Sequence, residues 1–275
     1  MVIDAHQHFW IFDPVRDSWI DDSMKAIQKD FLPKNLKPIL DANSIDGCVV
    51  VQSDQTEIEN LFQLTNALQN DFVKGVVGWV DLRSKKIEEK LAHYSYYSKM
   101  KGFRHILQGE KDRALMLKKA FMNGISLLEK YNFTYDILVY PKQLKDAVFI
   151  ARSCPDTQFV LDHMAKPLIK EGKVTQWANY MKELSENPNI VCKVSGMVTE
   201  ADYANWKKED FYIYLDVVLN SFGTDRLLYG SDWPVCLVAA TYGEQLDILE
   251  SYFRELSQNE KDKIFGQNAV RIYRL

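Results

Sequence analysis

Short apolar runs alternate with longer amphipathic stretches along this chain. Eight runs are nearly continuous in hydrophobic, often β-branched residues, which is typical of parallel strands covered by helices. They are residues 2–8, 47–53, 73–80, 102–107, 135–140, 158–163, 190–195 and 227–232. The pattern therefore predicts eight buried strands.

The segments between these runs have the spacing of helices. In residues 57–69 apolar side chains recur every three or four positions, after a Thr56 that can cap the first turn. The same spacing is found in residues 115–131, 141–152, 174–186 and 211–222, and residues 243–273 can close the outside as one or two helices. Residues 9–33 instead predict a long loop after the first strand.

Eight strand–helix units in 275 residues, with no linker-like break, predict an α/β protein with a single (β/α)8 TIM barrel over residues 1–275. A doubly wound sheet is the alternative. Such a sheet usually has a glycine-rich phosphate turn after its first strand, where this chain has His-Gln-His-Phe-Trp.

Composition excludes several classes of function. The net charge is −4, from 34 basic and 38 acidic residues without a dense basic run, so we expect no nucleic-acid partner and no polybasic membrane anchor. No apolar stretch approaches the roughly 18 residues of a membrane span. The four cysteines form no Cys-x-x-Cys pair, which favours reduced, packed thiols in a cytoplasmic protein. The first strand begins at about residue 2, so we expect no signal peptide.

Polar side chains gather at the carboxyl ends of the predicted strands, where a (β/α)8 barrel has its active site. His6 and His8 are two positions apart on one strand, so both should project from the same face. The other strand ends hold or adjoin Gln52, Trp79, Arg104, His105, Tyr140, Asp162, His163, Lys193 and Asp232. Four of the five histidines fall at these ends, which favours a functional site over chance placement.

Three of these residues also have a structural interpretation. Asp232 can close a strand through an Asx turn before Trp-Pro. Lys193 can be a buried cation that is paired with a carboxylate. His105 should point away from Arg104 on a regular strand, so we expect it to be structural.

The motifs at the strand ends resemble those of one family. They occupy residues 4–10, 51–57, 75–82, 101–108, 135–139, 159–167, 192–202 and 229–236, and so cover nearly the whole chain. Together they are similar to the amidohydrolase superfamily, and within it to the sugar-lactonase branch of L-fuconolactonases and L-rhamnonolactonases. The His-x-His start is common to the superfamily, whereas the motifs of the fourth, seventh and eighth strands are more specific to this branch.

The resemblance implies a hydrolase of carbohydrate catabolism that opens an L-fucono- or L-rhamnono-lactone to the aldonic acid. Asp232 would activate the attacking water, while His6, His8 and His163 polarise the lactone carbonyl. The side chains expected to bind the sugar are Arg104, Gln52, Tyr140, Lys193, Trp79 and Trp19. We expect a monomer or a homodimer.

Departures from the wider superfamily bear on metal use. Two-metal members have a lysine or glutamate bridge on the fourth strand and a histidine on the fifth, where this chain has Arg104 and Asp136. A two-metal site is therefore not expected. His6, His8, His163 and Asp232 suit a single zinc or manganese ion. A lactone carbonyl is electrophilic enough that we do not expect the ion to be essential.

Two other functions remain open at this point. One is a metal-dependent decarboxylase of the same superfamily, which would share the histidines and the aspartate of the eighth strand. The other is a non-catalytic barrel that binds a sugar acid. The decarboxylase rests on analogy of fold alone, whereas the binding barrel is judged from the site, because it would keep the arginine and tryptophan wall but would not need Asp232 and three converging histidines.

Overall fold

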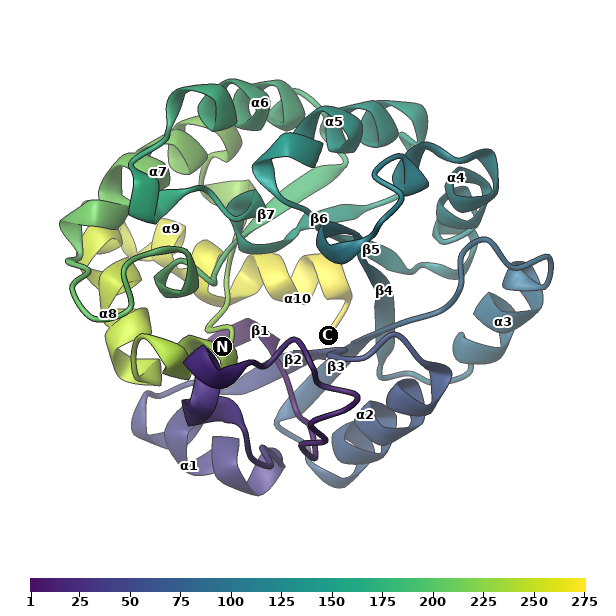
Figure 1. Ribbon diagram of the computed structural model, residues 1–275, viewed down its shortest axis with the longest axis horizontal. Coiled ribbons are helices and arrows are strands. Elements are labelled where there is room, and N and C mark those ends of the chain that lie inside the picture. Colours follow the sequence, from purple (N-terminus) through teal and green to yellow (C-terminus); the bar gives the residue numbers. More distant parts are fainter.

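The computed structural model describes residues 1–275 and contains one parallel sheet in which each strand pairs with the next along the chain. The strands are β1 (Ile3–Gln7), β2 (Gly47–Val51), β3 (Val73–Gly78), β4 (Met100–Ile106), β5 (Thr134–Leu138), β6 (Phe159–Leu161), β7 (Ile190–Val194) and β8 (Leu227–Tyr229). Just beyond β8, the Asp232 amide donates to the His6 carbonyl at 2.8 Å and the His8 amide donates to the Trp233 carbonyl at 2.7 Å. The sheet thereby closes on itself, which confirms the predicted TIM barrel (Figure 1).

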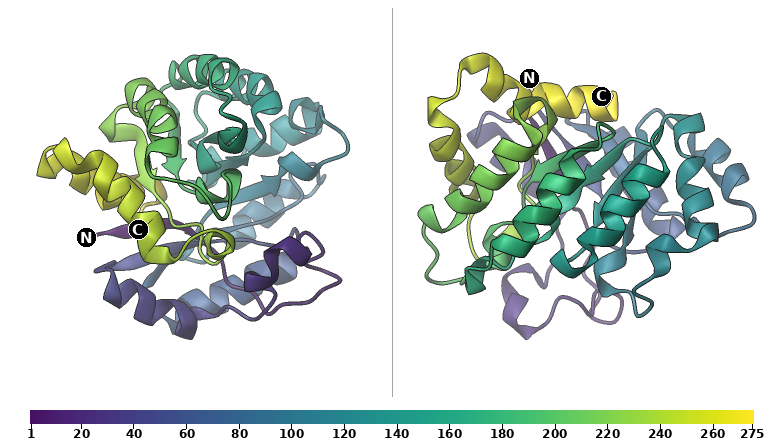
Figure 2. Two further views of the ribbon diagram at one scale, coloured as in Figure 1. Left: turned by 60° about the vertical axis from the view of Figure 1, so that its left-hand side comes forward. Right: turned by 90° about the horizontal axis from the view of Figure 1, so that it is seen from above.

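Helices surround the barrel, and the last of them crosses one of its ends (Figures 1 and 2). They are α1 (Pro33–Ala42), α2 (Glu57–Gln69), α3 (Ile87–Tyr94), α4 (Lys119–Ser126), α5 (Leu144–Ser153), α6 (Thr175–Ser185), α7 (Glu209–Phe222), α8 (Tyr242–Tyr252), α9 (Gln258–Asp262) and α10 (Asn268–Tyr273). None of these helices has both the length and the apolar character that crossing a membrane requires. The four cysteines are unpaired and buried, as expected.

The last helix closes one end of the barrel. Small and branched side chains from the strands, among them Ala5, Val49 and Val160, form an apolar interior layer together with Ile272 and Tyr273 of α10. Figure 1 shows α10 crossing the middle of the barrel, and Figure 2 shows it lying over one end. This is the amino-terminal end of the strands, so the opposite end is left for a binding cavity.

Several predicted boundaries are wrong. The sixth and eighth strands end before His163 and Asp232, because these residues have φ of +52° and +57°, which an extended strand cannot adopt. The single helix predicted over 115–131 is broken, because Lys118 is extended and α4 spans only Lys119–Ser126. The predicted loop 9–33 contains a short 3₁₀ helix over Asp22–Ile27, and α1 and α3 are not among the helices that the spacing predicts.

Candidate active site

His6 and His8 face the barrel interior because β1 is not a regular strand. The pairing of β1 with β2 shifts in register after Asp4. Ala5 belongs to the interior apolar layer, whereas Asp4 reaches outward and accepts a hydrogen bond from Tyr242 on α8. The irregularity turns His6 inward directly after Ala5, and His8 follows on the same face.

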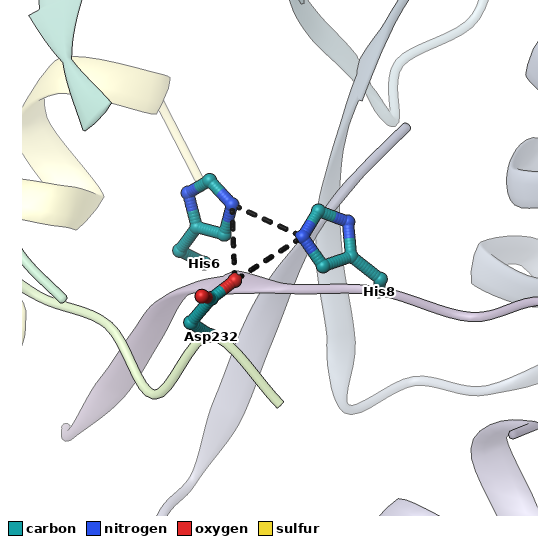
Figure 3. Close-up of side chains that lie close together, drawn as sticks. All are labelled: His6, His8 and Asp232. Carbon is teal, nitrogen blue, oxygen red and sulfur yellow. Dashed lines mark hydrogen bonds and ion pairs between the residues drawn. The ribbon is translucent and has the colours of Figure 1, made fainter. Parts of the chain in front are cut away.

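Both histidines meet Asp232 at the carboxyl end of the barrel (Figure 3). Nε2 of His6 lies 3.2 Å from Nε2 of His8. The Asp232 Oδ1 atom is 3.4 Å from Nε2 of His8 and 3.9 Å from Nε2 of His6. His8 Nδ1 lies 2.7 Å from the Val51 carbonyl, which can only accept, so this nitrogen carries the hydrogen and Nε2 of the neutral ring offers a lone pair.

His6 is held from its other side by a buried carboxylate. Its Nδ1 atom is 3.2 Å from Oδ1 of Asp162, whose Oδ2 accepts a hydrogen bond from Arg104 at 3.0 Å. Burial opposes ionisation of Asp162, but Lys193, His6 and Arg104 outweigh it and hold the pKa of this carboxyl well below its usual range. Nη1 of Arg104, which can only donate, lies 3.3 Å from Nε2 of His6, so this nitrogen is an acceptor on the side that faces His8 and Asp232.

His163 approaches Asp232 from a turn after β6. Its Nε2 atom is 3.8 Å from Asp232 Oδ1, and its Nδ1 atom is 2.9 Å from the Ser195 hydroxyl. Burial lowers the pKa of both His6 and His163, so these rings are neutral at pH 7. Burial opposes ionisation of Asp232 as well, but the neighbouring His163, His8 and Lys166 outweigh it and lower its pKa. The centre is therefore an ionised Asp232 carboxylate beside the neutral imidazoles of His6 and His163.

This donor set fits one divalent cation. The ligand atoms of His6, His8 and Asp232 lie within 4.8 Å of one another, and two lone pairs and a negative charge converge between them. Imidazole and carboxylate ligands are those that zinc and manganese accept. His163 is near this group, although it forms its own grouping with His6 and Asp162.

A cavity of about 240 Å³ opens above this centre. It is lined by His8, Trp19, Ser53, Arg104, Ile106, Gln108, Gly109, Leu138, His163, Lys166, Asp232 and Val235. Of the residues that the sequence suggested for sugar binding, Arg104 and Trp19 line this cavity. Ser53, Gln108 and Lys166 are not among the predicted site residues, although the motifs over 51–57, 101–108 and 159–167 contain them.

The other suggested sugar-binding residues lie outside the lining. Gln52 is fully buried and its amide donates to the Arg104 carbonyl at 3.2 Å. Trp79 donates to Nδ1 of His105 at 3.1 Å, and His105 itself packs away from the barrel interior. Tyr140 is only half-buried, and it precedes the short 3₁₀ turn that leads into α5.

Lys193 has the buried position that its structural interpretation requires. Its ammonium lies 2.6 Å from Oδ2 of Asp136 and 3.0 Å from Oδ1 of Asp162, with no exposed surface. The hydroxyl of Tyr273 on α10 donates to Asp136 Oδ2 at 2.7 Å. These residues form a polar layer below the cavity, above the apolar layer closed by α10.

Comparisons with known proteins agree with this architecture. The model of the amidohydrolase family matches residues 3–275. The L-fucono-1,5-lactonase of Burkholderia multivorans is 36% identical over 99% of this chain and 96% of its own length, and that of Burkholderia ambifaria is 34% identical over 99% and 95%. A crystal structure of an amidohydrolase from Burkholderia multivorans with bound zinc superposes with a TM-score of 0.97 at 36% identity, covering 100% of this chain and 99% of that chain. The chain therefore belongs to the amidohydrolase family.

Proposed function

We propose that this protein hydrolyses a sugar lactone, most closely L-fucono-1,5-lactone, to the open-chain aldonic acid. The observation that carries the proposal is the ionised Asp232 facing His6, His8 and His163 at the base of a cavity. The two L-fucono-1,5-lactonases are similar along the full chain, which supports this substrate class over the decarboxylase and the non-catalytic barrel.

In the proposed reaction, Asp232 takes a proton from a water molecule in the cavity as the water oxygen bonds to the lactone carbonyl carbon. The carbonyl π electrons move to oxygen, and the Arg104 guanidinium and His163, with its hydrogen on Nε2, stabilise this negative charge. The ring C–O bond then breaks, and Asp232 returns its proton to the departing ring oxygen. The aldonic acid loses its own proton to solvent.

The sugar would lie between the polar centre and the outer wall of the cavity. Arg104 offers guanidinium hydrogens to ring hydroxyls, and the partly exposed Trp19 offers an apolar surface to the sugar face. Trp79 and Tyr140 are half-buried just after β3 and β5, and Gln52 donates to the Arg104 carbonyl, so we propose that these three shape the cavity from its second layer.

His6, His8, Asp232 and, nearby, His163 would hold a divalent ion, which supplies Lewis-acid polarisation of the carbonyl when it is bound. We propose that this ion assists the reaction and is not essential for it. A lactone needs less polarisation than an amide because its alkoxide leaves more readily.

The test is a pH-indicator assay on a panel of aldonolactones that includes L-fucono-1,5-lactone and L-rhamnono-γ-lactone, with and without chelator. We expect acid release, and we expect Asp232→Asn to lower kcat by about 10²–10⁴. Asp71→Asn, an exposed carboxyl just before β3, is the matched control and should keep full activity.

The outcomes separate the parts of the proposal. Acid release that survives chelation supports a dispensable ion, whereas release that zinc restores after chelation contradicts this part alone. A normal rate in Asp232→Asn would overturn the role of Asp232. No acid release from any lactone, with or without added zinc or manganese, would overturn the proposed function.

A further inference from the structure

Four consecutive residues after β6 adopt a left-handed conformation. His163, Met164, Ala165 and Lys166 have φ of +52°, +52°, +57° and +51°, and none of them is glycine. Each non-glycine residue in this region costs about 1–2 kcal/mol, so a run of four persists only where the surrounding structure enforces it. A turn of about three residues per repeat returns the fourth side chain to the side of the first. Accordingly, both His163 and Lys166 line the cavity.

Lys166 brings a largely buried positive charge to this cavity. Its side chain is 14% exposed, and its ammonium donates to Glu200 Oε1 at 2.7 Å. Burial disfavours the charge, but Glu200 and Asp232 outweigh burial and raise the pKa of Lys166, so the ammonium is charged at neutral pH. Glu200 ends a short 3₁₀ turn after β7, so the pair joins two loops across the cavity wall.

The Glu200 bond leaves the ammonium with further donors. An ammonium has three hydrogens, and the contact with Glu200 uses one of them. Lys166 belongs to the lining of the cavity and Glu200 does not, so Glu200 holds the lysine from outside the lining. The contact with Glu200 thus holds the Lys166 ammonium in place and leaves hydrogens on it that a ligand in the cavity can accept.

Resting on the proposed lactone hydrolysis, we propose that Lys166 is a further catalytic residue whose ammonium stabilises the tetrahedral oxyanion and then the product carboxylate. Glu200 is its positioning residue. The substrate is neutral and the reaction creates a negative charge, so the attraction to Lys166 grows as the bond to water forms. An interaction that is stronger in the transition state than in the bound substrate raises kcat rather than lowering KM.

This role differs measurably from two others that Lys166 could have. A contact with a sugar hydroxyl would bind substrate and transition state alike, so its removal would raise KM and leave kcat unchanged. A purely structural ion pair with Glu200 would affect the melting temperature and leave product affinity unchanged. The product carries the carboxylate that Lys166 is proposed to meet, so its affinity is the second readout.

The experiment compares Lys166→Met, Lys166→Arg and Glu200→Gln with the wild type. We expect Lys166→Met to lower kcat on L-fucono-1,5-lactone by about 10²–10³ with KM within about threefold. Lys166→Arg keeps the positive charge, so its kcat should exceed that of Lys166→Met by at least about tenfold. Glu200→Gln should lower kcat by about tenfold with little change in KM. Lys170→Met removes an exposed lysine from the same loop and should match the wild type.

Binding of L-fuconate, measured by calorimetry, gives an independent test. We expect Lys166→Met to weaken it at least about tenfold and Lys170→Met to leave it unchanged. A rise in KM alone, or equal affinity of wild type and Lys166→Met for L-fuconate, would overturn the proposal. If Lys166→Met does not fold, an unchanged kcat in Glu200→Gln together with unchanged L-fuconate affinity would overturn it.

The two proposals fail separately. If the wild type hydrolyses no lactone, the proposed function is wrong. L-fuconate binding that depends on Lys166 would then still support its carboxylate contact, whereas no binding by either protein would overturn that contact.

Discussion

Replacing Lys193 by methionine should destabilise the protein strongly. The ammonium is completely buried and lies 2.6 Å from Asp136 and 3.0 Å from Asp162. Arg104 still pairs with Asp162 in the variant, and the Tyr273 hydroxyl still donates to Asp136, but Asp136 loses its cation. Removing one partner of a buried ion pair costs about 3–5 kcal/mol, because the other charge stays buried without compensation. We expect this loss in the free energy of unfolding for Lys193→Met.

The loss should depend on pH. Burial raises the pKa of Asp136, and Lys193 is the largest effect that opposes this rise, so the pKa should climb further in Lys193→Met. A carboxyl whose pKa is higher in the folded than in the unfolded protein stabilises the fold at low pH. That stability is lost as the pH rises from about 4 through the folded value. The deficit of Lys193→Met should therefore be larger at pH 8 than at pH 5.

Urea denaturation followed by tryptophan fluorescence at both pH values measures this deficit. Lys170→Met is the control for loss of an exposed lysine, and we expect it to change stability by less than about 0.5 kcal/mol. The double variant Lys193→Met with Asp136→Asn removes the orphaned charge and should recover part of the loss. A loss below about 1 kcal/mol in Lys193→Met, or one that is equal at both pH values, would refute the reasoning.

Two further substitutions test the framework around Asp232. Gly196 has a φ of +63°, and an alanine there would place its Cβ 2.6 Å from Nδ1 of His163. We therefore expect Gly196→Ala to lower the free energy of unfolding by about 1–3 kcal/mol and to lower kcat. An unchanged melting temperature and an unchanged kcat would contradict this prediction. Tyr242→Phe removes a donor to Asp4, whose pKa burial raises to about 6, so this pKa should rise further. Tyr242→Phe should lower the free energy of unfolding by about 1–2 kcal/mol, and by more at pH 8 than at pH 5. Urea denaturation at both pH values measures this loss, and an equal loss at the two values or a larger one at pH 5 would contradict the prediction.

The fold could be predicted because its cause is local in the sequence. Each strand of the barrel is buried on both faces, so it appears as a continuous apolar run, and the covering helices appear as amphipathic stretches. Knowledge that the carboxyl ends of all eight strands meet then brought His6, His8 and Asp232 together without any contact information. The central group of the candidate site thus followed from topology alone.

The local backbone irregularities that orient the side chains of the site could not be predicted from the sequence. On a regular strand Asp4 and His6 would share a face, but the shift of register in β1 separates them. A bulge depends on how two strands pair, and the apolar pattern of one strand does not record it. The sequence does not predict the left-handed turn at residues 163–166 either, because the turn contains no glycine.

Lys166 and Lys193 illustrate the errors that follow from these unpredicted irregularities. The sequence predicts a sugar-binding role for Lys193 and none for Lys166, yet the structure buries Lys193 below the cavity and places Lys166 in its wall. Both follow or end a strand, so position along the chain does not separate them. Their depth in the barrel separates them, because Lys193 lies on β7 within the polar layer, whereas Lys166 lies in the turn after β6 and lines the cavity.

The polar layer also explains why this chain offers one cation site rather than two. Asp162 could serve a second ion with His6 and His163, but Arg104 and Lys193 already hold this carboxylate at 3.0 Å each. A divalent ion added there would face two fixed positive charges in a buried layer, where repulsion is weakly screened. Asp232, in contrast, has only histidine nitrogens as ion-pair partners. Arg104 and Lys193 thus supply the positive charge that a second metal would bring, and His6, His8 and Asp232 are left to hold a single ion where the lactone carbonyl is proposed to lie.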